Sequence, residues 1–133
     1  MQAVKGKNTS LEKKVASALH REGMRFRRNL PSLPGKPDMV FTKAKVAVFV
    51  DGDFWHGWQY PKWKNKLSDY WQKKIERNRR RDRLNFRRLR RSGWKVIRLW
   101  GHEVDKDLMH AVDRVRVLLQ AAQTDEGKIR LRK

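Results

Sequence analysis

The sequence predicts an α/β protein in which a mixed central β-sheet is packed between flanking helices. Two observations support this fold class. Stretches with apolar residues at helical spacing alternate along the chain with short runs rich in β-branched and aromatic residues. One of these runs, 46–50, is apolar at every position, which is typical of a strand buried on both faces. We therefore expect residues 46–50 to form the central strand.

The first expected helix covers about 10–22. Thr9 and Glu12 have the spacing of a capping box, apolar residues then recur at helical spacing, and Gly23 supplies a C-terminal stop. The next segment, 24–29, is interpreted as a short strand with a basic face. The chain therefore enters the sheet from a helix.

A second, long helix is expected from its N-cap, Ser68, to about Ser92, and a strand at 94–100 follows it. The apolar stripe of this helix also contains Asn78 and Asp82, which is unusual for a face that packs on a sheet.

The last helix is expected to open at Asp105 or Asp107. The length of 133 residues is that of one domain, which we place at 1–122. The remaining segment, 123–133, is polar and basic and is expected to be a mobile tail.

The chain is strongly basic. Its 34 Lys and Arg residues oppose 14 acidic residues, which gives a formal net charge of +20. A field of this sign attracts polyanions, with DNA or RNA the first candidate and an anionic membrane surface the second. The lack of cysteine excludes disulfides, thiolate zinc ligands and a thiol nucleophile. No stretch suits a membrane span or a signal peptide, so we expect a cytoplasmic protein.

Two aspartates stand at the ends of neighbouring expected strands. Asp38 follows the proline-rich loop 30–37 and opens the strand 39–41, whereas Asp51 ends the strand 46–50. Antiparallel pairing of these strands would bring both carboxylates to one edge of the sheet. Carboxylates placed there can hold Mg²⁺, which also takes water and phosphate oxygens as ligands. The alternative is that both residues simply end strands at loops.

Two further polar residues have both a structural and a chemical interpretation. Glu12 satisfies a backbone N–H at the helix start, and it would become a third site carboxylate if that helix start lies near the two aspartates. His56 is able to take a proton from water near neutral pH, although a surface or structural histidine is the commoner case.

Aromatic residues are concentrated just after the central strand. Phe54 and Trp55 come first, with Trp58, Tyr60 and Trp63 behind them. Exposed aromatic side chains beside a basic surface can stack on bases or wedge between base steps. The alternative is a small core under the loop, and we expect some residues in each class.

The second helix carries a dense run of cations. Residues 73–91 include 11 Lys and Arg against Glu76 and Asp82. A charged run is commonly just a solvated face, but this excess is too large for pairs at i, i+4 to neutralise. We therefore expect contacts with phosphates and a steep dependence of binding on salt.

Taken together, these residues resemble the very short patch repair (Vsr) endonucleases, which belong to the PD-(D/E)xK nuclease superfamily. The resemblance covers roughly residues 1–120 and rests on an ordered series of motifs: NTSLEKKVASAL, G-x-x-F-R, LPGKPD, VFVDGDFWH, K-I-x-x-N-x-x-R-D and GWKVIRLW. LPGKPD and FWH at this spacing are quite specific. The resemblance implies a restriction-endonuclease-like core, so that residues 1–122 form a single endonuclease domain.

The resemblance implies an Mg²⁺-dependent enzyme that nicks one strand of DNA 5′ to the thymine of a T·G mismatch. By the family pattern, Asp38 and the backbone carbonyl of Val50 hold Mg²⁺, and His56 helps to activate water. Glu12 would support the site. We expect the enzyme to act as a monomer on double-stranded DNA, with no membrane partner.

The resemblance also implies how DNA is contacted. The Phe54–Trp55 pair and an N-terminal methionine, Met1, would wedge into the DNA beside the mismatch. Phosphate contacts are assigned to cations of the segment after the first helix and of the long helix: Arg25, Arg27, Arg28, Arg79, Arg80 and Arg83.

The chain departs from the family pattern in two places. Asp51 stands where family members usually carry a histidine, and because an aspartate can ligate metal we assign it to the metal site. The family also holds a structural zinc through cysteines and histidines. The matching positions here are Asp53, Trp58, Tyr60 and His102, so no structural zinc is expected.

Two other functions stay open at this point. One is a related PD-(D/E)xK nuclease of different specificity, either restriction-type or directed at branched DNA. The other is a non-catalytic nucleic-acid-binding module that has the same basic surface.

Overall fold

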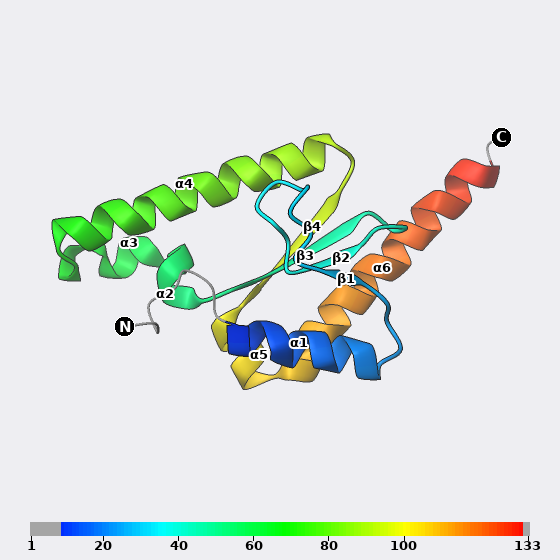
Figure 1. Ribbon diagram of the computed structural model, residues 1–133, viewed down its shortest axis with the longest axis horizontal. Helices are drawn as coiled ribbons and strands as arrows, with labels where there is room; N and C mark the ends of the chain where they lie inside the picture. The colour runs from blue at the N-terminus through cyan, green and yellow to red at the C-terminus, as the bar shows by residue number, and fades with distance from the viewer. Residues whose placement is uncertain (1–8, 132–133) are drawn as a thin grey trace.

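The computed structural model describes the backbone of residues 9–131 and the side chains of residues 10–123. Within these residues, one four-stranded sheet lies at the centre, with helices on both faces (Figure 1). In sheet order, the strands are β1 (Arg27–Arg28), β2 (Met39–Phe41), β3 (Val46–Asp51) and β4 (Lys95–Trp100). The predicted class, a mixed sheet between helices, is confirmed.

β3 is a central strand because it pairs on both sides. It runs antiparallel to β2, with Met39 opposite Val48, and parallel to β4, with Asp51 opposite Trp100. All of its residues are buried, as the sequence predicts for this strand. The antiparallel register places the start of β2 near the end of β3, and this is where the expected site residues gather.

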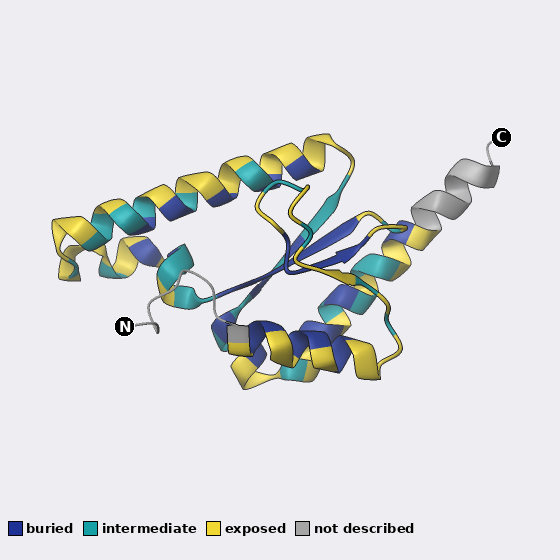
Figure 2. Ribbon diagram, in the orientation of Figure 1, coloured by how far each residue is buried: buried dark blue, intermediate teal, exposed yellow. Residues whose placement is uncertain are grey.

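In the described part of the chain the sheet is flanked by α1 (Thr9–Arg21), α4 (Asp69–Arg91), α5 (Gly101–Lys106) and α6 (Leu108–Leu131). α1, α5 and α6 pack on one face, and α4 covers the other (Figure 1). Figure 2 shows the buried residues of α4 along the side that faces the sheet. Among the described helices, none is both long and apolar enough to cross a lipid bilayer.

The side chains of β3 alternate between these two layers. Val48 and Val50 belong to the core under α1, α5 and α6. Phe49 belongs to the core under α4. Asp51 is two residues after Phe49 and therefore points to the α4 side, where the candidate site is built.

Glycine ends the two long predicted helices. Gly23 and Gly93 have left-handed φ angles of 82° and 88°. Beyond Gly23, the N–H of Met24 donates to the carbonyl of Leu19 at 3.1 Å, which closes the last turn of α1. α4 begins directly after Ser68, as predicted.

The segment after β3 differs from the prediction, whereas the start of the last helix agrees with it. The segment after β3, interpreted as a loop, contains two short helices, α2 (Asp53–His56) and α3 (Tyr60–Trp63), and α5 was not predicted. Asp107 opens α6, because its Oδ1 accepts a hydrogen bond from the N–H of His110 at 3.1 Å. The α6 backbone continues to Leu131, and the mobile tail expected at 123–133 stays a prediction.

Candidate active site

A tight turn delivers Asp38 to the site. Gly35 and Lys36 both have left-handed backbone, with φ angles of 79° and 50°, and Pro37 then leads the chain into β2. A Cβ atom at Gly35 would lie 3.1 Å from Cε1 of Phe49, so the turn packs closely against the sheet. Asp38 is consequently buried at the start of β2.

Asp38 lies directly beside the end of β3. Its Oδ2 accepts a hydrogen bond from the N–H of Val50 at 2.6 Å, and its own N–H donates to the carbonyl of Val48 at 2.9 Å. The N–H and C=O of one residue in an extended strand point to the same side. The carbonyl of Val50 therefore points to the side of β3 on which Asp38 lies.

The two polar residues on the inner stripe of α4 are part of this site. Asn78 donates from Nδ2 to the carbonyl of Trp55 at 2.9 Å, which ties α2 to α4. Asp82 lies one helical turn further along, and its Oδ2 is 2.7 Å from Nδ1 of His56. Both side chains are buried. Asn78 and Asp82 on the inner face of α4 thus position α2, which carries His56.

His56 lies between two carboxylates. Its Nδ1 contacts Asp82, and its Nε2 is 3.4 Å from Oδ1 of Asp51. Burial lowers the pKa of His56, but the hydrogen bond to Asp82 and the negative charges of Asp51 and Asp82 outweigh burial, and the pKa is raised. In the neutral tautomer with its proton on Nδ1, Nε2 carries the lone pair.

Arg98 of β4 is a site residue that the sequence alone did not reveal. Its Nε donates to Oδ2 of Asp51 at 2.7 Å, and its Nη2 donates to Oδ2 of Asp82 at 2.5 Å. The period of two along β4 could have indicated it, because Arg98 follows Val96 on the α4 side of the sheet. One cation therefore bridges the two carboxylates that flank the histidine.

The acids and the histidine form a compact group. One ligand atom from each of Asp51, His56 and Asp82 lies within 4.8 Å of the other two. Burial raises the pKa of Asp51. The cations at His56 and Arg98 oppose this shift without cancelling it, and the charge of Asp82 adds to it.

Asp38 and this group share one cavity of about 470 Å³. The acids are buried, whereas the cations that also line the cavity are exposed. An incoming anion is therefore attracted by the cations, while the carboxylates can take a metal ion. The lining includes the acids, the histidine and two cations: Asp38, Asp51, Asp82, His56, Lys36 and Arg81.

Glu12 is buried and pairs with a residue outside this group. Its Oε1 accepts a hydrogen bond from Nη2 of Arg28 at 3.1 Å, which joins α1 to β1. Glu12 does not line the cavity that Asp38 and Asp51 share. Its expected support of the active site stays a prediction.

The aromatic residues after β3 pack with α4. The rings of Phe54 and Trp63 are stacked with centroids 5.7 Å apart, and those of Trp55 and Trp71 are 5.5 Å apart. Nζ of Lys74 is 5.3 Å from the centroid of the Trp55 ring. Phe54 is 40% exposed. The cluster therefore presents an aromatic surface beside a cation, and the third expected wedge residue, the N-terminal methionine, lies outside the described residues.

The cations assigned to phosphate contacts differ in their surroundings. On α4, Arg80 and Arg83 are exposed, whereas Cζ of Arg79 lies 5.2 Å from the centroid of the buried Tyr60 ring. Arg28 is exposed and paired with Glu12. The outer face of α4 is thus the stronger candidate for contact with DNA.

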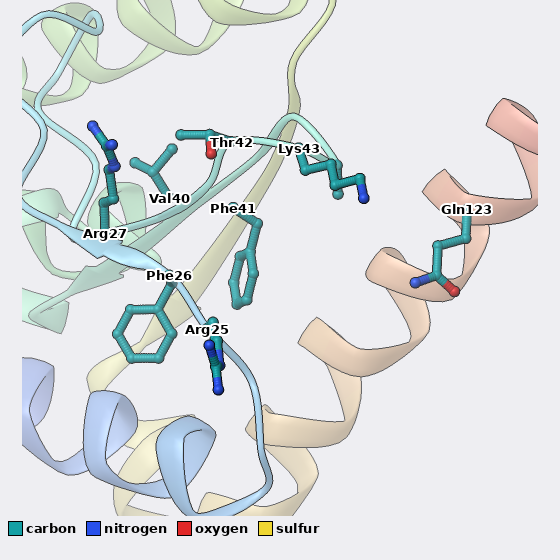
Figure 3. Close-up of a pocket in the computed structure, with 9 residues that line it drawn as sticks. Arg25, Phe26, Arg27, Val40, Phe41, Thr42, Lys43 and Gln123 are labelled. Carbon is teal, nitrogen blue, oxygen red and sulfur yellow. The ribbon is translucent and has the colours of Figure 1, made fainter.

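Arg25 and Arg27 line a second cavity of about 490 Å³ (Figure 3). It lies beside the turn between β2 and β3, at the opposite end of β3 from Asp51. The residues that line it include cations and no carboxylate. This cavity therefore has no metal-binding acids and is separate from the candidate active site.

The mixed sheet, the acids at adjacent strand ends and the histidine beside them define a nuclease of the restriction-endonuclease-like class. Comparison with known proteins agrees with this class. The family described as DNA mismatch endonuclease Vsr matches residues 1–62. A type II nicking enzyme of Neisseria meningitidis serogroup C, V.NmeDIP, is 42% identical over 96% of this chain and 86% of its own length.

Two other relatives are also similar. The type II nicking enzyme V.XorIIP of Xanthomonas oryzae is 44% identical over 90% of this chain and 88% of its own length. DNA mismatch endonuclease Vsr of Escherichia coli is 36% identical over 75% of this chain and 65% of its own length. The chain belongs to the Vsr endonuclease family and is a DNA endonuclease.

The positions that match the structural zinc ligands of the family do not fit zinc here. Oδ1 of Asp53 is 3.1 Å from Nδ1 of His102, and the ring of Trp58 lies 4.1 Å from that imidazole between centroids. Trp58 has no lone pair to give a metal. The hydroxyl of Tyr60 donates to Glu76 at 2.8 Å, and desolvation and this bond raise its pKa to about 12. These four side chains therefore do not supply a tetrahedral zinc set.

Proposed function

We propose that this protein is an Mg²⁺-dependent endonuclease that nicks one strand of double-stranded DNA 5′ to the thymine of a T·G mismatch. The observation that carries the proposal is the single cavity lined by Asp38, Asp51 and His56. Relatives named as nicking enzymes support cleavage of one strand, and the relative named as a mismatch endonuclease supports the mismatch. We expect the enzyme to act as a monomer in the cytoplasm, bound to DNA.

Asp38 and the carbonyl of Val50 are the groups that would hold Mg²⁺. Both are oxygen donors, which this ion prefers, and they lie side by side at the ends of β2 and β3. When bound, the ion would stabilise negative charge on the phosphate and on the leaving oxygen. Asp51 is the third expected ligand, but its Oδ2 is already paired with Arg98.

His56 is the proposed general base. Asp82 holds its Nδ1 and fixes the ring, so that Nε2 can take a proton from the attacking water. The water oxygen then bonds to phosphorus as the bond to the leaving oxygen breaks. The raised pKa makes His56 a stronger base once it is neutral.

Affinity and discrimination are assigned to different surfaces. Exposed cations of α4, such as Arg80 and Arg83, would bind phosphates and carry no base information. Phe54 and Trp55 would sense a weak base step, because opening a mismatch costs less than opening a matched pair.

The test is a nicking assay with Mg²⁺ on duplexes that are matched, carry one T·G mismatch, or are branched. The wild-type protein should nick the T·G duplex in one strand, and Asp38→Asn should abolish nicking. Asp105→Asn is the matched control, since this exposed acid pairs with Lys14 and does not line the cavity, and it should keep full activity.

The outcomes separate the candidate functions. Equal nicking of matched and T·G duplexes would remove the mismatch assignment and leave a nuclease of another specificity. Preferential cutting of branched DNA would favour a branched-DNA nuclease. Binding without cleavage of any duplex would mean that the protein is a non-catalytic nucleic-acid-binding module.

A further inference from the structure

We propose that Arg98 takes the place of a second metal ion, so that the enzyme binds a single divalent ion at Asp38 and Asp51 is not a metal ligand. The inference deepens the proposed function and rests on it, because it concerns how many ions the same cavity uses. It also gives a role to the cation that bridges the acids around His56.

The acids next to His56 form the kind of group that can hold a cation. Ligand atoms of Asp51, His56 and Asp82 lie within 4.8 Å of one another, and the two carboxylates are buried. Bringing two carboxylates this close without a cation is unfavourable, because each raises the cost of ionising the other. The group therefore requires a compensating positive charge.

Arg98 already supplies that charge, because its guanidinium donates to both carboxylates at once. Its Nε and Nη2 atoms donate to Oδ2 of Asp51 at 2.7 Å and to Oδ2 of Asp82 at 2.5 Å. A guanidinium stays protonated at any pH at which the enzyme works. A divalent ion placed between these carboxylates would have to displace Arg98 or lie beside a like charge.

Displacement is opposed by the packing of the guanidinium. Cζ of Arg98 lies 4.2 Å from the ring centroid of Trp100 and 5.1 Å from that of Phe86, and the side chain is only 21% exposed. Stacking on aromatic rings stabilises a partly desolvated cation. Parallel pairing of β3 with β4 places Arg98 opposite Phe49, two residues before Asp51 on the same face of the sheet, and so fixes the backbone position of Arg98.

The surroundings of Asp38 differ from those of this pair. Oδ2 of Asp38 accepts a neutral backbone N–H from Val50, whereas the guanidinium of Arg98 is engaged by Asp51 and Asp82. The cavity thus divides its acids into one metal-binding residue, Asp38, and a pair that Arg98 neutralises and that positions His56.

The experiment counts Mn²⁺ ions bound per protein by calorimetric titration in the absence of DNA. Wild type should bind one ion, Asp51→Asn should still bind one, and Asp38→Asn should bind none. A wild-type count of zero or two, or loss of an ion in Asp51→Asn, would overturn the proposal for Arg98. If Asp38→Asn keeps the ion while Asp51→Asn loses it, the metal assignment in the proposed function fails as well.

Variants of Arg98 test its role directly. Arg98→Met removes the charge with little change in side-chain length, and it should raise the count from one ion to two. Adding Asp51→Asn to that variant should return the count to one, and Arg98→Lys should keep one. An unchanged count in folded Arg98→Met contradicts the proposal, and if that variant does not fold, the comparison of wild type with Asp51→Asn decides.

Discussion

Nδ1 of His56 lies 2.7 Å from Oδ2 of Asp82, although 26 residues separate them in the sequence. The contact joins α2 to the middle of α4 and orients the imidazole. Burial lowers the pKa of His56, but this contact and the charge of Asp51 from β3 outweigh burial and the charge of Arg98 from β4, and the pKa is raised. The pH at which this residue becomes a base is therefore set by neighbours from three other elements.

Replacing Asp82 by Asn should move the acid limb of the pH–rate profile to lower pH. His56 must be neutral to accept a proton, so nicking falls as the pH drops through its pKa. Asn removes the negative charge and the hydrogen-bond acceptor that raise this pKa, so the acid limb should move to lower pH. The maximum rate should also fall, because Asn binds Nδ1 less firmly. Single-turnover nicking of a T·G duplex between pH 5 and 9 measures both effects.

Asp105→Asn is the control for that experiment. It removes an exposed carboxylate of α5 that does not line the cavity. Its acid limb should coincide with that of the wild type. An Asp82→Asn profile that is lower at every pH but has an unmoved acid limb would show that Asp82 is structural and does not set the pKa of His56.

Exposed cations on α4 should control the salt dependence of DNA binding. Arg80→Gln and Arg83→Gln each remove one exposed charge. Each true phosphate contact contributes about 0.9 to the slope of log K against log salt concentration, so each variant should lower the slope by about that amount. Fluorescence anisotropy with a matched duplex at several salt concentrations gives the slope. Arg116→Gln on α6, whose side chain pairs with Glu22 and Asp113, should leave it unchanged.

Local patterns predicted the scaffold and drew attention to several residues of the candidate site. The apolar run of β3 and the turn before Asp38 follow from residue type and spacing alone, and Asn78 and Asp82 were already unusual on the stripe of α4. Arg98 was missed because its partners come from β3 and α4. Only the sheet register and the packing of α4 bring those residues together.

The short helices were missed for a related reason. α2 and α3 have four residues each, too few for helical periodicity to be visible. They are held by contacts with distant residues, such as the bond from Asn78 to the carbonyl of Trp55 in α2 and the bond from the hydroxyl of Tyr60 in α3 to Glu76. Tertiary contacts of this kind leave no local pattern in the sequence.

A strong chelator should leave the melting temperature of the protein unchanged. The segment that zinc would tie down is held instead by the Asp53–His102 pair and by Trp58 against His102. His102→Ala removes both contacts and should cost about 1 kcal/mol, which lowers the melting temperature by several degrees. His110→Ala, an exposed histidine on α6, should have little effect. A large fall on chelation would show that a metal stabilises the fold.

Trp55→Ala should weaken discrimination between T·G and matched duplexes more than it weakens binding. The ring packs on Trp71 and lies near Lys74, so it contributes an aromatic surface and little of the total positive charge. Loss of one stacking contact is worth about 1–3 kcal/mol, which predicts at least a fivefold loss of T·G preference. Ratios of nicking rates on the two duplexes measure it. Leu84→Ala, an exposed residue of α4, is the control, and an unchanged ratio in Trp55→Ala would exclude the wedge.

The two glycines that flank α2 should differ in how replacement by alanine affects the stability of the protein. Gly57 has a φ angle of 73°, and a Cβ there would lie 2.7 Å from Cδ of Arg79 and 3.0 Å from Cγ2 of Ile75. Gly57→Ala should therefore lower the free energy of unfolding by about 1–3 kcal/mol. Gly52 has a φ angle of −65°, and a Cβ there would meet no atom within 4 Å, so Gly52→Ala should be neutral or slightly stabilising.

Denaturant unfolding of both variants measures this difference. Since both substitutions add the same methyl group next to the helix that carries His56, a general sensitivity of the segment would affect them equally. A loss of stability in Gly57→Ala alone is expected because the turn at Gly57 is left-handed and packs against Arg79 and Ile75 of α4. Equal free energies of unfolding for the two variants would mean that the turn is not held in this conformation in solution.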